Sequence, residues 1–425
     1  MTGKRIARVA PLVVVAVAGA ALAGCSGQQS GGDDDEVGGE LSIPSHLWES
    51  GPDAEYMTLL EDLTLEEYPG LTIDKPIVPF ADYHQQVYTQ MASGQAPDVV
   101  VPYDPQMNQW VQQDLLEPLN PWLEEAGVDV EAMIDAEQVA VVDGQVYGLL
   151  GFTNPRMFVY NQRLLEDAGV EPPTTPDEWR SVIEAVSDPA NGVFGAAMVT
   201  GGASPVDIYQ YLMPIVAGFG GAFVTDGEPT ATDDEVVEAL EFVKGLYDDG
   251  LLPVGQSSAD VVDAFQAGKI ATVVTGPFLV PASQDANPAA AADFTLSEAP
   301  FENPTVSVNV FFAMPKDAKN KDAAAAFIMN VVNQDLLDFT IEAKRVPPGV
   351  PIEVPQALLT EAPYLESVVA AAETAVSYSP GGVGDEATSV MNVIGDAFQA
   401  MLVNGTSAQD TAAAIQSELE ALLAG

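Results

Sequence analysis

The sequence predicts an α/β fold divided into two lobes. The chain has 425 residues, of which 47% are hydrophobic, so it can bury a large core. A chain of this length usually forms two domains rather than one. Strand-like and helix-like segments alternate from residue 41 to 101, and the alternation restarts after residue 150. This order is typical of sheets flanked by helices.

Residues 1–24 have the pattern of a signal peptide. Three basic residues occur among the first eight, and the next 16 residues, 9–24, carry no charge. A membrane-spanning helix needs about 20 apolar residues, so a cleaved signal is the better interpretation. Residues 22–25, Leu-Ala-Gly-Cys, resemble a lipobox, in which the thiol of Cys25 is acylated. The alternative is a buried Cys25 behind an ordinary signal peptide.

The segment after the signal peptide predicts a flexible acidic tether. Residues 25–40 are rich in Gly, Ser, Gln and acidic residues and contain almost nothing that can pack. We therefore expect Cys25 to anchor the chain at the extracytoplasmic face of the cell membrane, with the folded part beginning at residue 41.

The first lobe begins with alternating strands and helices. A strand is expected at 41–43, followed by a helix at 53–68 with apolar residues on one face. A second strand is expected at 71–73 or 76–78, and a second helix at 83–92. Residues 99–101, three consecutive valines, predict a parallel strand that is buried on both faces.

The later elements are predicted from strand patterns and helix-capping signals. Residues 157–160 predict a strand. A helix should begin after Thr175, with Glu178 closing a capping box, and Thr232 with Glu235 repeats that signal. The last helix is expected at 411–423, with Asp410 as its N-cap.

The composition excludes several classes of function. The chain has 63 acidic and 14 basic residues, giving a net charge of −49, which argues against binding to nucleic acids or anionic lipids. One cysteine excludes an internal disulfide bond and a cysteine zinc site. Such acidity suits a high-salt habitat or a cell-surface protein, and it equally serves solubility alone.

Catalytic patterns are sparse. The sequence has no G-x-S-x-G motif and no Walker A loop. His46 and His84 are the only histidines; either could bind a metal or act as a base, but ordinary polar roles are favoured. No pair among the many carboxylates stands out as a glycosidase couple. We therefore expect no enzymatic activity, no metal and no cofactor.

Aromatic residues near the ends of strands point to a ligand-binding cleft. Trp48 and Tyr103, with Asp104 beside it, follow predicted strands, and Phe278 follows an apolar strand predicted at 270–274. Phe152 lies where the chain passes between the two halves. Ligands of α/β proteins bind beyond the carboxyl ends of strands, and aromatic rings beside polar groups suit the face and hydroxyls of a sugar. The alternative is that these rings pack inside the lobes.

Four segments, taken together, resemble one family. They are residues 160–179, which include YNQRLLEDAGV and PPTTPDEW, and residues 92–100, 268–278 and 319–324. They are similar to the sugar-binding family of extracellular solute-binding proteins of ABC importers, which includes maltose-binding protein. The resemblance implies a two-lobed periplasmic-binding-protein-like fold. Each lobe would have a mostly parallel sheet flanked by helices, with a ligand cleft at the hinge.

The resemblance also implies boundaries for the lobes. Lobe 1 would contain residues 41–152 and 309–343, and lobe 2 would contain residues 156–305 and 351–425. The chain would cross between them at 152–156, 303–309 and 345–350.

The resemblance implies a set of ligand contacts as well. They are Trp48, Tyr103, Asp104, Phe152, Asn154, Arg156, Tyr209, Gln210, Phe219, Phe278, Asn309 and Arg345. The sequence departs from the family pattern at three places. Phe278 replaces a Trp common in the family, residues 307–309 replace a Gly-Gly pair, and Pro102 stands beside Tyr103 where maltose-type members have a Trp.

The expected function is that of a monomeric substrate-binding lipoprotein. It would capture a mono- or oligosaccharide outside the cell and deliver it by hinge closure to an ABC permease. One alternative is a non-sugar solute such as a polyamine or a peptide, because an acidic protein attracts cations. The other is a secreted lipoprotein glycosidase.

Overall fold

The computed structural model describes residues 38–201 and 204–424. The predicted signal peptide, Cys25 and most of the predicted tether therefore lie outside the described residues. The first strand begins at Gly38, so the last residues assigned to the tether belong to the fold instead. Among the described residues, no helix is both long and apolar enough to cross a membrane.

The first part of the described chain folds into short strands and amphipathic helices. Its elements are β1 (Gly38–Ser42), α1 (Gly51–Glu67), β2 (Gly70–Asp74), α2 (Phe80–Ala92), α3 (Asp104–Gln112), α4 (Asn120–Ala126), β3 (Val141–Val142), β4 (Gln145–Val146) and β5 (Gly148–Pro155).

A second group of elements follows β5. It consists of β6 (Met157–Asn161), α5 (Gln162–Ala168), α6 (Pro176–Val186), β7 (Phe194–Ala196), α7 (Pro205–Gly218), β8 (Val224–Thr225), β9 (Glu228–Pro229), α8 (Asp234–Asp248), α9 (Ser258–Gln266), β10 (Ile270–Thr275), α10 (Leu279–Ala286) and β11 (Phe294–Ser297).

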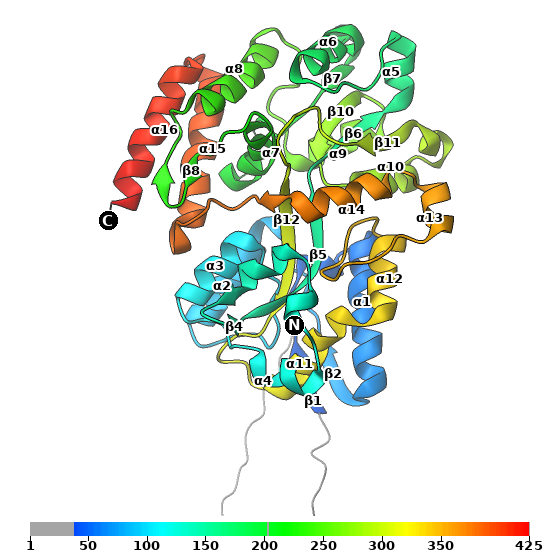
Figure 1. Cartoon of the computed structure of the whole chain (residues 1–425), viewed down its shortest axis with the longest axis vertical. Coiled ribbons are helices and arrows are strands. Elements are labelled where there is room, and N and C mark those ends of the chain that lie inside the picture. Colours follow the sequence, from blue (N-terminus) through cyan, green and yellow to red (C-terminus); the bar gives the residue numbers. More distant parts are fainter. Residues whose placement is uncertain (1–37, 202–203, 425) are drawn as a thin grey trace, which may run out of the picture. The chain divides into compact units, whose positions relative to one another are not determined.

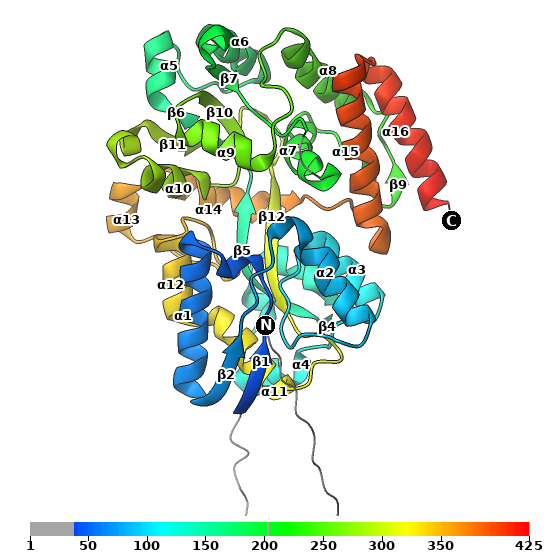
Figure 2. The same cartoon turned by 180° about the vertical axis from the view of Figure 1, so that it is seen from behind.

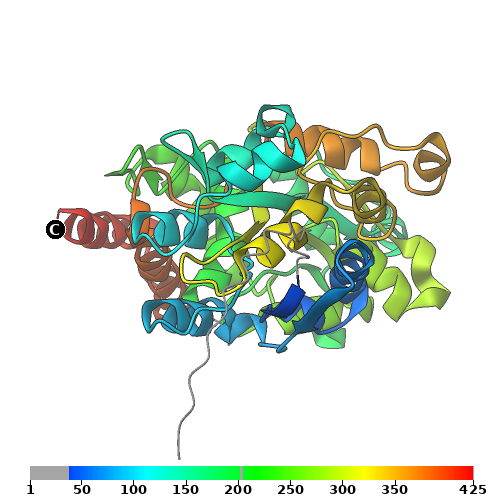
Figure 3. The ribbon, with the colours of Figure 1, turned by 90° about the horizontal axis from the view of Figure 1, so that it is seen from below.

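The last part of the chain contributes to both halves of the molecule. Its elements are β12 (Val306–Ala313), α11 (Lys321–Met329), α12 (Gln334–Glu342), α13 (Gln356–Glu361), α14 (Leu365–Thr374), β13 (Val376–Ser377), α15 (Ala387–Asn404) and α16 (Ala408–Leu423). Helices α13 and α16 lie on opposite sides of the second lobe (Figures 1 and 3).

The buried apolar residues form two large cores, which confirms the two-lobed α/β fold. One core draws on residues 41–152 and 310–346, and the other on residues 158–308 and 378–419. Strand β12 contributes Val306 and Val308 to the second core but Val310 to the first. The long strands β5 and β12 therefore cross from one lobe to the other, as Figures 1 and 2 show.

The sheets are mixed rather than mostly parallel. Strand β1 pairs with β2 in parallel, and β10 pairs with β7 in parallel but with β6 antiparallel. The crossing strands β5 and β12 are antiparallel, because the second crossing returns toward the first lobe. The direction of β12 also corrects the prediction of a parallel strand at residues 99–101. All three valines are fully buried, but only Val100 forms a bridge, antiparallel to Ala313 of β12.

One of the three predicted N-caps, that of α6, is confirmed. Thr175 caps α6, and its hydroxyl accepts a hydrogen bond from the N–H of Glu178. The carboxylate of Glu178 bonds Thr174 rather than Thr175, so the predicted capping box is incomplete. The other two caps were wrong. The N-cap of α8 is Asp233, and that of α16 is Ser407, three residues before Asp410.

Candidate functional site

A cavity of about 340 Å³ lies between the two lobes. This volume is within the usual range of small-molecule sites, about 300–1,000 Å³. Helices α2 and α3 form the first-lobe wall, while α7, α15 and the residue after β13 form the second-lobe wall. The lining residues are Phe80, His84, Gln85, Tyr88, Tyr103, Gln106, Gln109, Trp110, Ser204, Val206, Asp207, Gln210, Tyr378, Thr388 and Asn392.

Uncharged polar groups and aromatic rings dominate this lining. Five amide side chains and two aliphatic hydroxyls face the same space as five Phe, Tyr or Trp rings. The one charged lining residue is Asp207, in the first turn of α7. Burial raises the pKa of Asp207, and its hydrogen bonds to Ser204 oppose that shift. The cleft is thus nearly neutral, although the chain as a whole is strongly acidic.

An aromatic cluster supports the first-lobe wall. The hydroxyl of Tyr103 is hydrogen-bonded to Nε2 of His46, with 2.9 Å between the two atoms. Phe80 and His84 pack against Tyr103, with ring centroids 5.8 Å and 5.0 Å away. The packing of rings around Tyr103 fixes its side chain at the edge of the cleft.

The two histidines, far apart in the sequence, come together in this cluster. The ring centroids of His46 and His84 are 6.5 Å apart. Burial lowers the pKa of His46 from 6.5 to about 4, and that of His84 to about 3. Both rings are therefore neutral at pH 7. The described residues contain no group of three or more side chains suited to holding a metal ion.

Of the predicted contacts, Tyr103 and Gln210 line the cavity. Gln210 lies on α7 and accepts a hydrogen bond from Nη2 of Arg156, at 3.4 Å. Arg156 is buried behind this contact and is not itself part of the lining. This hydrogen bond links Arg156 to the cavity lining through the amide of Gln210.

Asp104 and Asn309, both predicted as ligand contacts, bind each other instead. The carboxylate of Asp104 accepts hydrogen bonds from the backbone N–H of Asn309 at 2.9 Å and from its side-chain amide at 2.7 Å. It also accepts one from the hydroxyl of Ser377 at 2.9 Å. Burial raises the pKa of Asp104 to about 6, against the effect of these bonds. This network joins α3, β12 and β13.

Four predicted aromatic contacts pack in the lobe cores rather than in the cleft. Trp48 is buried in the first core, and its Nε1 donates to the carbonyl of Ile43. Phe152 packs edge-on against Tyr56 in the same core. Tyr209 is buried in the second core, where Phe219 packs against Phe242 and Phe301 at its edge.

The other three predicted contacts lie at the hinge or on the surface. Asn154 pairs with Val308 where β5 meets β12. Phe278 is 41% exposed at the start of α10, and Arg345 forms an ion pair with Glu361. These three residues do not line the cavity.

Sequence reasoning did not identify most of the amides in the cleft. Gln106 and Gln109 lie on α3, Gln85 on α2 and Asn392 on α15. A signal was present, because α3 carries several amides but Asp104 is its only charged residue. In so acidic a chain, a polar but uncharged helix is a reason to expect a neutral ligand.

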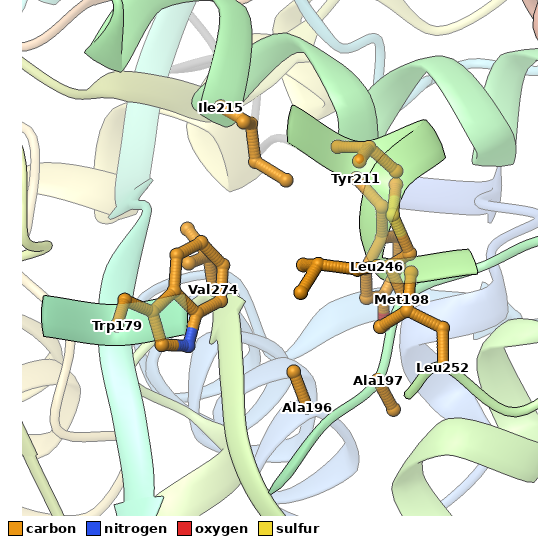
Figure 4. A pocket seen from close by; sticks show the side chains of 10 residues that line it. Trp179, Ala196, Ala197, Met198, Tyr211, Ile215, Leu246, Leu252 and Val274 are labelled. Atoms are coloured by element: carbon orange, nitrogen blue, oxygen red, sulfur yellow. The ribbon is translucent and has the colours of Figure 1, made fainter. Parts of the chain in front are cut away.

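Two other cavities are less suited to a polar ligand. One, shown in Figure 4, lies inside the second lobe beside Trp179, Tyr211 and Val274. Its volume of about 10 Å³ is about that needed for a single water molecule. The other, about 250 Å³, lies at the third crossing beside Ile134, Pro348 and other mainly apolar residues.

Comparison with known proteins places the chain in a family. Residues 50–335, more than half of the chain, match the family model of the bacterial extracellular solute-binding protein. The maltotriose-binding protein of Pyrococcus abyssi is 25% identical over 280 residues, which cover 62% of this chain and 57% of that protein. Lipoprotein LipO of Bacillus subtilis is 27% identical over 263 residues, covering 57% of this chain and 49% of that protein.

Solved structures share the fold of this chain over most of its length. Maltose-bound MalE3 of T. maritima has a TM-score of 0.80 at 18% identity, and the match covers 90% of this chain and 99% of that one. The chain spans about half to 60% of the length of the curated relatives that it matches. Because the family model covers most of both lobes, the chain belongs to the family of bacterial extracellular solute-binding proteins.

Proposed function

We propose that this protein is the substrate-binding lipoprotein of an ABC importer for a carbohydrate. The observation that carries the proposal is the cleft, where amides, hydroxyls and aromatic rings from both lobes face one space. Aromatic rings stack on the apolar face of a sugar ring, while amides and hydroxyls bond its hydroxyl groups. The names of two relatives, which refer to maltotriose and maltose, support a sugar over other solutes.

Capture would proceed by closure of the lobes around the ligand. We assign residues 41–152 and 309–343 to one lobe and residues 156–305 and 351–425 to the other, with the crossings between them acting as the hinge. Within this division, α13 of the second lobe also packs against Ile341 of α12 through Leu358. A ligand that contacts both walls favours the closed state, which the permease would recognise.

The anchor and the lack of catalysis belong to the same proposal. Acylation of Cys25 would hold the binding protein at the membrane beside its permease, and the similarity to a protein named as a lipoprotein supports this. A glycosidase of the usual type requires two carboxyl groups at the scissile bond. Among the described residues, Asp207 is the one carboxylate in the lining of this cleft, which favours binding without hydrolysis.

The proposal is tested by ligand screening with the purified full-length chain. Maltose, maltotriose and arabino-oligosaccharides form one arm, and spermidine and a short peptide form the other. At least one sugar should raise the melting temperature and give a saturable calorimetric titration, with the sugar recovered intact. Binding of spermidine or the peptide without any sugar would overturn the proposal, and so would cleavage of the bound sugar.

A further inference from the structure

Three buried polar atoms on the first-lobe wall of the cleft have no hydrogen-bond partner among the described residues. They are Oε1 of Gln106, Nε1 of Trp110 and Nε2 of His84. Gln106 is 7% exposed and Trp110 is 0% exposed, and all three residues line the cavity between the lobes. Buried polar groups are nearly always paired, because an unpaired one destabilises the fold.

The three atoms come from two adjacent elements of one wall. Gln106 and Trp110 are four residues apart on α3, so their side chains lie on the same face of that helix. His84 lies on α2, and its ring centroid is 6.3 Å from that of Trp110. The three residues therefore lie on the same wall of the cleft.

The chemistry of each atom defines what could pair with it. The indole nitrogen of Trp110 only donates, and Oε1 of Gln106 only accepts. The backbone of Val101 favours the protonated form of the His84 ring, and because Nε2 has no partner, we assign the ring proton to Nδ1. The ring is neutral, since burial lowers its pKa to about 3, so Nε2 is an acceptor. The three atoms thus offer two acceptors and one donor.

We propose that His84, Gln106 and Trp110 form a subsite for the hydroxyl groups of the ligand. This inference rests on the proposed function. It adds that the first-lobe wall of the cleft selects a ligand with hydroxyl groups. Hydroxyls donate to Nε2 of His84 and Oε1 of Gln106, and a hydroxyl oxygen accepts from Nε1 of Trp110. An ammonium group can donate but cannot accept from Trp110, and a carboxylate or phosphate can accept but cannot donate to the two acceptors.

The test compares variants that replace one polar side chain with an apolar one of similar or smaller size. Trp110→Phe removes the donor, and Gln106→Met removes the acceptor. Trp179→Phe is the matched control, because Nε1 of Trp179 already bonds Thr272 inside the second lobe. The probe is maltotriose, or whichever sugar of the panel binds the wild type most tightly.

The subsite predicts about a tenfold rise in the dissociation constant for Trp110→Phe and for Gln106→Met, as expected for the loss of one ligand hydrogen bond. The unliganded melting temperature of Gln106→Met should stay the same or rise, because this variant removes an unpaired buried group. Trp110→Phe should melt lower, because its smaller ring leaves a cavity in the first core. Trp179→Phe should likewise melt lower but bind normally. In the wild type, the indole N–H resonance of Trp110, assigned by its loss in Trp110→Phe, should shift on sugar binding.

The outcomes separate the two proposals. If the wild type binds no sugar, the proposed function fails and the subsite fails with it. If the wild type binds sugar while both variants keep its affinity and the Trp110 resonance does not move, only the subsite is overturned. Should Trp110→Phe unfold, the affinity of Gln106→Met still decides.

Discussion

Trp48 and Tyr103 occupy similar sequence positions but different environments. Both follow a predicted strand at the edge of the first lobe. Trp48 is buried in the core with its indole N–H bonded to a backbone carbonyl, whereas Tyr103 lies at the edge of the cleft. An aromatic residue after a strand can therefore serve the core or the site, and tertiary contacts decide which.

This difference predicts opposite effects of two substitutions. Tyr103→Ala should weaken sugar binding by about 2 kcal/mol, roughly 30-fold, as for the loss of a central aromatic anchor. Trp48→Ala should cost about 3–5 kcal/mol of stability, because it removes a core side chain. Calorimetric titration and urea unfolding of both variants provide the check. Equal affinity losses without loss of stability would contradict the assignment of Trp48 to the core.

Glu137 predicts a pH dependence of stability. It is fully buried, and its Oε2 accepts a hydrogen bond from the N–H of Leu150 at 2.7 Å. Burial raises its pKa from 4.5 to about 8. Between these values the folded chain keeps a proton that the unfolded chain has lost. This contribution to stability is therefore present below about pH 4.5 and is lost as the pH rises through about 8.

Glu137→Gln tests this dependence, because glutamine resembles the protonated acid at every pH. The free energy of unfolding of the wild type should fall, relative to that of the variant, as the pH rises from 5 toward 9. Urea unfolding at several pH values measures the difference. Parallel curves for the two proteins over this range would show that Glu137 ionises normally.

At the scale of elements, the Asp104 network connects the lobes. The carboxylate of Asp104, the first residue of α3, accepts three hydrogen bonds. Two come from Asn309 of β12 and one from Ser377 of β13. Thr153 of β5 extends the network through Asn309 at 2.6 Å. Buried hydrogen bonds through Asn309 thus join the crossing strands β5 and β12 to Asp104, and Ser377 connects the same carboxylate to β13.

Asp104→Ala should be strongly destabilising, because it leaves three buried donors without an acceptor. The expected loss is at least about 2 kcal/mol, since each unpaired group costs about 1–3 kcal/mol. Ser377→Ala removes only one bond to the same carboxylate and should cost about 1 kcal/mol. Urea unfolding at pH 7 compares the two. Equal losses would mean that Asp104 is not the centre of the network.

Helices with local signals could be predicted from the sequence, whereas pairings between distant segments could not. Helix α6 was predictable because its N-cap Thr175 and its apolar face are local signals. The antiparallel partner of residues 99–101 was not, because β12 lies more than 200 residues further along the chain. The same distance explains why the sequence did not predict the contact between Asp104 and Asn309, which are 205 residues apart and bind each other outside the lining of the cavity.

The cleft was likewise only partly predictable. Tyr103 was predicted from its place after a strand and Gln210 from the family resemblance, and both line the cavity. Gln106 was missed although α3 is rich in amides and poor in charge, and Trp110 was missed because an aromatic residue on a helix has no sequence feature that distinguishes a cleft face from a core face. Their proximity to His84 depends on the packing of α2 against α3.

For the whole molecule, the membrane anchor is the feature most easily tested by one substitution. Cys25 follows Leu-Ala-Gly and is the only cysteine in the chain. Cys25→Ala should lose its acyl group and leave the membrane fraction. Metabolic labelling with a fatty acid, followed by fractionation, measures both effects. A wild-type protein that is unlabelled and fully released would contradict the lipobox interpretation.

The central claim is that a sugar is captured between two lobes that close around it. Strands β5 and β12 join the lobes, and the neutral, amide-rich cleft lies between them. Small-angle X-ray scattering of the full-length protein, with and without the best sugar of the panel at saturation, tests this claim most directly. The account predicts a smaller radius of gyration with sugar, and no change with spermidine. Superimposable curves with saturating sugar, or a decrease caused by spermidine alone, would contradict it.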